Sequence, residues 1–308
     1  MKPFLKWVGG KTQSLPEVLE RLPAELHNYY EPFLGGGSVL LAVLAKKAAG
    51  EIKITGQIYA SDVNVPLIGL YQALQTRLPE LLLELQKLVQ GLAQGLDLGQ
   101  GLDLAQGLDL AQGPVAAERY YYVLRDQFNA QLSRDPYAVL TAAMFLYLNK
   151  TCFRGVYREG PRGFNVPFGH YKSPPLFDFA HLGLVSALIQ DVVFTAHDFM
   201  RPLLQLLPGD FVYLDPPYAP EKCNSFVTYT AAGFSLDQHQ QLFAQCAALR
   251  QKKINFLLSN ADVPLVRVAF PEPTYFVHVF SCRRTIHSKT PSARTNEVLV
   301  CSAPEPCI

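Results

Sequence analysis

Short hydrophobic runs alternate along this chain with longer segments whose apolar residues recur at helical spacing. The strand-like runs lie at 57–62, 191–194, 211–214 and 254–259, and the helical patterns lie at 39–44, 63–88, 119–132, 136–148 and 236–250. Two further runs at 275–280 and 298–301 predict a closing hairpin. Strands that alternate with helices favour parallel pairing, so the pattern predicts an α/β fold.

The run at 211–214 ends in Asp215-Pro216-Pro217-Tyr218. Proline has no N–H for a strand ladder, so this strand should stop and leave an acid, a rigid turn and an aromatic ring at the carboxyl edge of the sheet, where open α/β sheets bind ligands. Asp215 and the Pro216 carbonyl can accept both hydrogens of an exocyclic amino group, and Tyr218 can stack on a base that has left a duplex. An ordinary turn is the competing interpretation.

Two glycine-rich segments precede predicted helices near the start of the chain. Gly9-Gly10-Lys11 can bring backbone N–H groups and a positive charge to an anion, and Ser14 and Glu17 have capping-box spacing in the helix that follows. Trp7, just before these glycines, would be an ordinary core residue on sequence alone.

The second segment, Gly35-Gly36-Gly37, has the position of a strand-to-helix turn that approaches a nucleotide-like ligand. Asp62, at the end of the next predicted strand, can hold ribose hydroxyls. No Gly-x-Gly-x-x-Gly is present, which favours a nucleoside that carries an amino acid, S-adenosylmethionine, over a dinucleotide.

Composition narrows the class of protein. The 308 residues are 49% hydrophobic and 17% charged, which is typical of a folded chain. No membrane span or signal-peptide pattern is present, so we expect an intracellular protein that is not secreted and binds no membrane. The six cysteines are scattered, which predicts neither a metal site nor a disulfide framework.

The net charge of +1 hides two basic stretches, at 150–172 and 250–294. Basic residues interleaved with aromatics are typical of a polyanion-binding surface, although solvated faces are the competing interpretation. Within them, Arg283 and Arg284 suit phosphate contacts. A six-residue unit repeats three times over 94–111 with a period that fits neither a helix nor a heptad. We expect 90–114 to be a surface insertion without a catalytic role, with a self-association patch of its leucines as the alternative.

Four stretches together resemble the Dam family of DNA adenine methyltransferases, of the D12 class and alpha type. They are Phe4-Leu5-Lys6-Trp7-x-Gly9-Gly10-Lys11, Glu31-Pro32-Phe33-x-Gly35-x-Gly37-Ser38, the segment from Leu148-Asn149-Lys150 to Phe164-Asn165-Val166-Pro167-Phe168-Gly169, and Asp215-Pro216-Pro217-Tyr218. The resemblance covers nearly the whole chain outside 90–114. It implies a Rossmann-like methyltransferase fold with an inserted, mainly helical target-recognition domain at 63–180, between catalytic parts at 1–62 and 181–308.

The resemblance also implies the roles of matching residues. The catalytic positions are Asp215, Pro216, Pro217 and Tyr218. The S-adenosylmethionine positions are Trp7, Gly10, Lys11, Phe33, Gly35, Gly37, Asp62 and Asp215, which reverses the core interpretation of Trp7. The DNA-binding positions, including those of the basic stretches, are Lys6, Lys150, Phe153, Arg154, Val156, Arg158, Pro167, Arg283 and Arg284.

The implied reaction is methyl transfer to N6 of a flipped adenine in double-stranded DNA, within GATC, with S-adenosylhomocysteine as product. Arg154 stands where relatives carry Asn, and one residue is missing before Phe164, so the recognition loop departs from the family at two points. Asp215 disfavours cytosine methylation, which usually has Ser there, and protein glutamine methylation, which has Asn. RNA adenine methylation, an inactive DNA-binding relative, a separately acting restriction endonuclease as partner, and a monomer or weak dimer all stay open.

Overall fold

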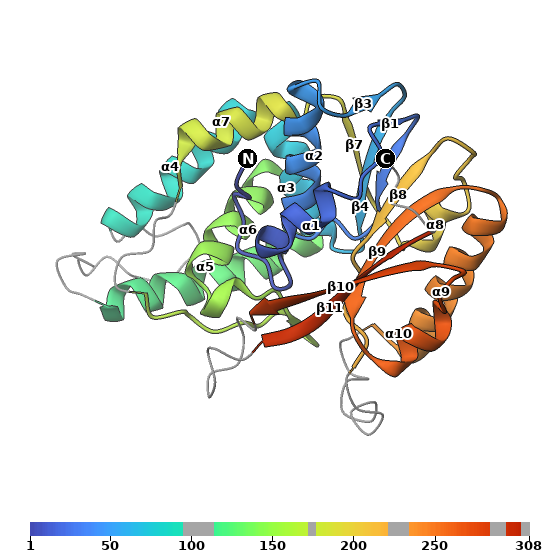
Figure 1. Ribbon diagram of the computed structural model, residues 1–308. Helices are drawn as coiled ribbons and strands as arrows, with labels where there is room; N and C mark the ends of the chain where they lie inside the picture. The colour runs from blue at the N-terminus through green and yellow to red at the C-terminus, as the bar shows by residue number, and fades with distance from the viewer. Residues whose placement is uncertain (95–113, 172–176, 221–233, 284–293, 303–308) are drawn as a thin grey trace. The chain divides into compact units, whose positions relative to one another are not determined.

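The computed structural model describes residues 1–94, 114–171, 177–220, 234–283 and 294–302 (Figure 1). Contacts divide the chain into two compact units. Unit 1 comprises Met1–Lys2, Lys11–Val63 and Asp191–Ile308, and unit 2 comprises Pro3–Gly10 and Asn64–Gln190. That these units are a catalytic and a target-recognition domain, with limits at 62 and 180, remains a prediction from the sequence.

Unit 1 is built on a seven-stranded sheet in the order β10-β11-β9-β8-β2-β4-β7. Its strands are β2 (Tyr29–Glu31), β4 (Ile58–Asp62), β7 (Val192–Ala196), β8 (Phe211–Leu214), β9 (Asn255–Ala261), β10 (Phe276–Arg283) and β11 (Arg294–Cys301). The strands from β7 to β9 pair in parallel, whereas β11 runs antiparallel to both β9 and β10. The predicted α/β class, the closing hairpin and the Rossmann-like arrangement are therefore confirmed.

The helices of unit 1 follow the predicted pattern with one correction. They are η1 (Lys11–Gln13), α1 (Leu15–Leu19), α2 (Ser38–Ala48), α8 (Met200–Leu203), α9 (Leu236–Gln251) and α10 (Pro264–Ala269), beside a small parallel pair of β1 (Glu25–Leu26) and β3 (Lys53–Ile54). The capping box predicted for Ser14 is wrong: ψ of Ser14 is 3°, outside the extended region, and its hydroxyl donates to the Lys11 carbonyl instead. A capping box does begin α9, between Ser235 and Gln238.

One face of the sheet holds the main core of unit 1. Val212 and Leu214 of β8 are fully buried and belong to a cluster with side chains from α8, α9 and α10. In Figure 1, α9 and α10 lie beside the orange and red strands at this end of the sheet. All four residues of β8 are buried, as the unbroken hydrophobic run predicts for a central parallel strand.

The sheet has a topological switch point between β2 and β8. From β2 the chain passes through α2 to β4 on one side, and from β8 it passes through α9 to β9 on the other. The segments that leave the carboxyl ends of β2 and β8 are therefore neighbours, and such a crevice is where open α/β sheets bind ligands. These segments are the glycine turn at 32–37 and the Asp-Pro-Pro-Tyr turn at 215–218.

Unit 2 is mainly helical, as predicted for the inserted part. Its elements are α3 (Val65–Thr76), α4 (Leu78–Gln94), α5 (Pro114–Arg134), α6 (Val139–Thr151), η3 (Phe153–Gly155), β5 (Glu159–Gly160), β6 (Gly163–Phe164) and α7 (Phe179–Leu188). The helical pattern at 63–88 forms two helices, because Arg77 (φ −137°) interrupts the helix. Helix α6 is the centre of the unit and is buried over most of its length.

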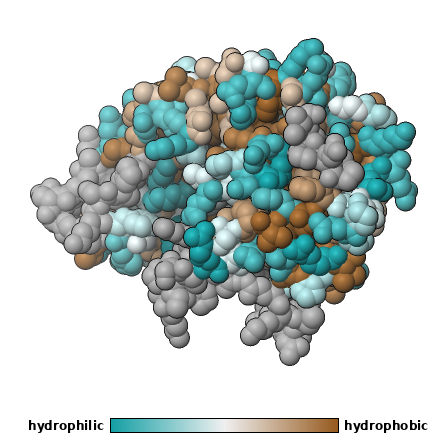
Figure 2. All heavy atoms as spheres, in the orientation of Figure 1, coloured by the Kyte–Doolittle hydropathy of each residue, from teal (hydrophilic) through white to brown (hydrophobic). Residues whose placement is uncertain are grey.

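On the face shown in Figure 2, hydrophobic and hydrophilic residues are interspersed. Within the described ranges, none of the helices combines the length and the apolar character that crossing a membrane requires. The repeat at 94–111 lies outside the described residues apart from Gln94.

Candidate active site

Asp215 lies directly beyond β8, at the switch point. Its Oδ1 atom is 2.7 Å from Nζ of Lys11, and the two side chains are only 18% and 6% exposed. Lys11 is held in place through its own backbone, whose N–H donates to Oγ of Ser38 at the first residue of α2 (3.1 Å). Lys11, Ser38 and Asp215, which lie far apart in the sequence, are therefore neighbours at this ion pair.

Burial and charge act on Asp215 in opposite directions. Burial raises the pKa of this carboxyl, and the neighbouring Lys11 ammonium lowers it through charge and a hydrogen bond. The balance leaves the pKa of Asp215 above its ordinary value, with the ion pair as the force that favours the carboxylate. An ionised Asp215 can accept hydrogen bonds from an amino group.

The glycine turn after β2 adopts conformations that suit glycine. Gly35 and Gly37 have φ values of 49° and 66°, and Gly37 is the residue that precedes α2. The Gly35 N–H donates to Oδ2 of Asp62 (3.0 Å), and the Leu34 N–H donates to the Ser61 carbonyl (3.0 Å). Asp62 therefore fixes the turn to the end of β4, in addition to its predicted role toward ribose hydroxyls.

An aromatic residue of the same turn, Phe33, is partly buried in unit 1. Its ring stacks on Phe199 with the centroids 5.2 Å apart, and Phe234 approaches it edge-on at 5.8 Å. The glycine turn, the acid at the end of β4 and this aromatic ring together make a site that suits a nucleoside, with backbone, carboxylate and apolar surface available.

Glu31 is a buried acid that opens the second motif and received no role from the sequence. It is the last residue of β2, its exposure is 3%, and its Oε2 accepts a hydrogen bond from the Tyr29 hydroxyl (2.8 Å). Burial raises the pKa of Glu31 to about 8, against the effect of the Tyr29 hydrogen bond. Glu31 is therefore mostly protonated at neutral pH, which lowers the negative charge near Asp215.

Tyr218 is held by residues from two neighbouring strands that were also not foreseen. Its hydroxyl donates to Oε2 of Glu297 on β11 (2.9 Å), and Nζ of Lys11 lies 4.7 Å from its ring centroid. The next backbone N–H, of Ala219, donates to Oδ1 of Asn260 on β9 (2.9 Å). No sequence motif marks Glu297 or Asn260, because both lie far along the chain from Tyr218.

Trp7 and Gly10, two predicted cofactor residues, belong to unit 2. The Trp7 ring is stacked on Tyr157 with the centroids 6.4 Å apart and is tilted toward Phe145 at the same distance. The Gly10 N–H donates to the Trp7 carbonyl (3.2 Å) and closes a turn. Their contact with a cofactor remains a prediction.

Lys6 is tied to the basic loop of unit 2 through Asn149. The Asn149 side chain accepts from the Lys6 N–H (3.0 Å) and donates to the Lys6 carbonyl (2.7 Å). The Lys6 ammonium donates to the Lys150 carbonyl (3.1 Å) and lies 4.1 Å from the ring centroid of Tyr171. Burial lowers the pKa of both Lys6 and Lys150. These contacts bring two predicted DNA-binding residues together, and Asn149 is the residue that joins them.

The next turn of the loop exposes an aromatic and a cationic side chain. Phe153 is 48% exposed, and the Arg154 guanidinium lies 5.2 Å from its ring centroid. Arg154 has a φ of 57°, and its N–H donates to the Tyr171 hydroxyl (2.9 Å). The Phe153 N–H donates to the carbonyl of Pro167, which is also exposed. Phe153, Arg154 and Pro167 thus lie on one surface.

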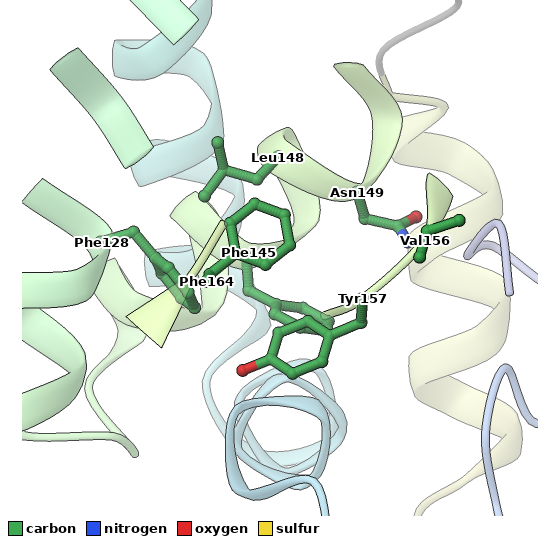
Figure 3. Close-up of a pocket in the computed structure, with 7 residues that line it drawn as sticks. All are labelled: Phe128, Phe145, Leu148, Asn149, Val156, Tyr157 and Phe164. Atoms are coloured by element: carbon green, nitrogen blue, oxygen red, sulfur yellow. The ribbon is translucent and has the colours of Figure 1, made fainter. Parts of the chain in front are cut away.

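Apolar packing fixes the rest of this loop. Val156, Tyr157 and Phe164 meet side chains of α5 and α6 around a small cavity (Figure 3) whose other lining residues are Phe128, Phe145, Leu148 and Asn149. Tyr157 is thus a partly buried packing residue of unit 2. Arg158, in contrast, is exposed and donates from Nε to Oδ1 of Asn165 (2.7 Å).

Two predicted DNA-binding residues cannot be placed in full. Arg283 is the last residue of β10, paired with Arg294, and its side chain lies outside the described residues, as does the whole of Arg284. Within the part of the chain that the structure describes, no cluster of three or more His, Cys, Asp or Glu side chains could hold a metal ion.

A seven-stranded sheet with a glycine turn and a buried acid at its switch point is the arrangement with which open α/β proteins bind nucleotide-like ligands. A family model described as D12 class N6 adenine-specific DNA methyltransferase matches residues 7–286. The chain belongs to this family and is an adenine-specific DNA methyltransferase, which confirms the resemblance on which the sequence analysis relied.

Curated relatives agree with this assignment. The Type II methyltransferase M.MjaIII of Methanocaldococcus jannaschii is 37% identical over 268 residues, which are 85% of this chain and 84% of the relative. The DNA adenine methylase of Escherichia coli K12 is 31% identical over 289 residues, which are 93% of this chain and 90% of the relative. A solved structure, the rRNA methyltransferase aviRa of Streptomyces viridochromogenes, is a distant neighbour, with a TM-score of 0.33 and 16% identity over 95% of this chain and 84% of its own.

Proposed function

We propose that this enzyme takes its methyl group from S-adenosylmethionine, flips the target adenine out of double-stranded DNA, and acts within GATC. The observation that carries the proposal is the Lys11–Asp215 ion pair at the switch point, next to the glycine turn that Asp62 holds. A chain that contains a cofactor turn, an acid paired with a lysine and a following aromatic ring has the groups that methyl transfer to an amino group needs.

The residues of unit 1 fit the donor. The positive φ values of Gly35 and Gly37 let backbone approach a ligand, Asp62 supplies carboxylate oxygens, and Phe33 supplies an apolar face. We assign these residues, with Lys11 and Asp215, to S-adenosylmethionine, and add Trp7 and Gly10 of unit 2 from the resemblance. When bound, the donor supplies an electrophilic methyl group on a sulfonium sulfur.

The chain's own residues contribute to the reaction by positioning the target amino group. An aromatic amine is a weak nucleophile, because its lone pair is delocalised into the ring. Asp215 and the Pro216 carbonyl accept the two amino hydrogens and direct the lone pair, while Pro217 stiffens the turn and Tyr218 stacks on the base. The nitrogen forms its bond to the methyl carbon as the carbon–sulfur bond breaks toward sulfur, and the amine proton leaves afterwards, so no base is required beforehand.

Unit 2 supplies most of the DNA contacts in this proposal, and Arg283 and Arg284 of unit 1 add to them. Lys6, Val156, Arg158 and Pro167 read bases, Lys150 binds the DNA, and Phe153 inserts into the base stack. The three arginines Arg154, Arg283 and Arg284 hold phosphates or guanine edges. The exposure of Phe153 beside Arg154 supports insertion of its ring. A relative named as a Type II methyltransferase also supports a restriction endonuclease as a separately acting partner.

The test is transfer of tritiated methyl from S-adenosylmethionine into duplexes that contain GATC, with single-base variants and an RNA duplex alongside. We expect label in GATC duplexes alone. Label in another sequence would move the specificity and implicate the Arg154 loop, and absence of label from every DNA would contradict the proposal. Asp215→Ala should reduce turnover by at least about a thousandfold and leave DNA affinity within about twofold, because it removes a group used in positioning the amine.

A further inference from the structure

Glu297 is connected to the Asp-Pro-Pro-Tyr turn by a single well-defined contact. The Tyr218 hydroxyl donates to its Oε2 atom at 2.9 Å, across 79 residues of sequence. Glu297 lies on β11 in register with Ala261 of β9, so the sheet fixes its backbone. A partly buried phenol that donates to a carboxylate forms a charge-assisted hydrogen bond, which is stronger than a bond between neutral groups.

The backbone after Tyr218 is held from the adjacent strand. Asn260 of β9 is fully buried and pairs with Val298, the residue next to Glu297. Its Oδ1 accepts from the Ala219 N–H (2.9 Å). Two neighbouring strands therefore restrain the same turn: β9 holds its backbone, and β11 holds the tip of its aromatic side chain.

The restraint leaves the Tyr218 ring little freedom to leave its place. An aromatic side chain has two rotatable bonds, and a fixed hydroxyl together with a fixed backbone determines χ1, which sets where the ring lies. Rotation about χ2 leaves the hydroxyl in place, so the hydrogen bond fixes the position of the ring and not the angle of its plane. Burial and the charges of Asp215 and Glu297 raise the pKa of Tyr218 well above its ordinary value, so the hydroxyl stays a donor. A phenol bonded to a carboxylate also has an electron-rich ring, which favours a neighbouring group that gains positive charge.

We propose that Glu297 is a positioning residue for methyl transfer, which holds the Tyr218 ring in place through the hydroxyl hydrogen bond as a stacking surface for the extruded adenine. The inference rests on the proposed function, in which Tyr218 stacks on the base. Glu297 acts through Tyr218 and contacts no reacting atom. Without this bond the ring samples other orientations, and the amine is held less often in line with the methyl group.

The experiment measures kcat and KM of methyl transfer for E297A, E297Q, Y218F and the E297A/Y218F double variant. E297A should lower kcat by at least about tenfold at saturating DNA and donor, with KM for the donor within about twofold. E297Q retains an oxygen that can accept from the hydroxyl, so its kcat should stay within about threefold of the wild type. Y218F should resemble E297A, and the double variant should be no worse than either single variant, because both remove one bond.

Glu272→Ala is the matched control, because Glu272 is an exposed acid of unit 1 outside this site. It should leave kcat unchanged, and thermal unfolding of every variant shows that each is folded. An E297A variant with wild-type kcat, additive losses in the double variant, or an E297Q variant as impaired as E297A would each overturn the inference. A wild-type enzyme that methylates no DNA would overturn the proposed function and this inference together, whereas the three outcomes above, with an active wild type, overturn the inference alone.

Discussion

At the scale of single residues, the site is a balance between carboxyl groups and one ammonium. Asp215 is paired with Lys11, and Glu31 and Glu297 add further carboxyls around them. If all three acids were ionised, the region would carry uncompensated negative charge in a buried place. The raised pKa of Glu31 reduces this negative charge, because a protonated Glu31 leaves Lys11 to stabilise the charge of Asp215.

This balance predicts a pH-dependent stability. The pKa of Glu31 rises from 4.5 to about 8 on folding, so the folded protein holds a proton that the unfolded chain releases between these values. The stabilisation that the protonated Glu31 side chain contributes is fully present below pH 4.5. It is lost as the pH rises to about 8, at about 1.4 kcal/mol per pH unit. The free energy of unfolding of the wild type, measured against Glu31→Gln by urea denaturation from pH 5 to 9, should therefore fall with pH and level off above about 8.

Glu31→Gln isolates the effect, because an amide keeps an acceptor for the Tyr29 hydroxyl and does not titrate. Other acids titrate in both proteins and cancel in the difference. Glu51→Gln serves as the matched control, since Glu51 is an exposed acid outside this site. A difference between wild type and Glu31→Gln that is constant with pH would show that Glu31 is ionised in the folded protein.

At the scale of elements, the turn after α6 determines how the basic loop meets the N-terminal segment. Gly155 has a φ of 66°, and a Cβ atom there would lie 2.3 Å from Cβ of Lys6. The Gly155 carbonyl also accepts from Asn149, the residue that joins Lys6 to α6. The loop and the segment at 3–10 can pack together only because position 155 has no side chain.

Gly155→Ala should therefore weaken both folding and DNA binding. A left-handed conformation costs a residue with a side chain about 1–2 kcal/mol, and the clash with Lys6 adds to this cost. Displacement of Lys6 and the loop should weaken affinity for a GATC duplex by at least about fivefold in fluorescence anisotropy. Gly183→Ala is the control, because Gly183 lies in α7 with no atom within 4 Å of the added Cβ, and it should stabilise the protein by about 0.5–1 kcal/mol. Equal DNA affinity in both variants would contradict this account of the loop.

At the scale of the whole molecule, sequence patterns within short segments correctly predicted most helices and strands and the residues at which key strands end. The strand before Asp215, the glycine turn before α2, the acid that ends β4 and the closing hairpin all follow from periodicity and from the backbone preferences of glycine and proline. Glu297 and Asn260 could not be singled out, and Glu31 and Asn149 received no role within their motifs, because the importance of these residues depends on partners brought close by folding. The Ser14 capping box was wrong because the Ser14 hydroxyl bonds Lys11 instead.

Replacing the segment that contains the repeat at 94–111 would show whether methyl transfer depends on it. Helices α4 and α5, on either side of it, each contact α6, so the packing of unit 2 involves residues outside the repeat. Replacing 95–113 by a Gly/Ser segment of equal length removes its leucines and keeps the connection between the helices. We expect kcat within about twofold of the wild type, since no assigned catalytic, cofactor or DNA-binding residue lies in the segment. Light scattering on both proteins checks the alternative: a dimer that the replacement converts to a monomer would assign the leucines to self-association, and a loss of methyl transfer would contradict the prediction that this segment has no catalytic role.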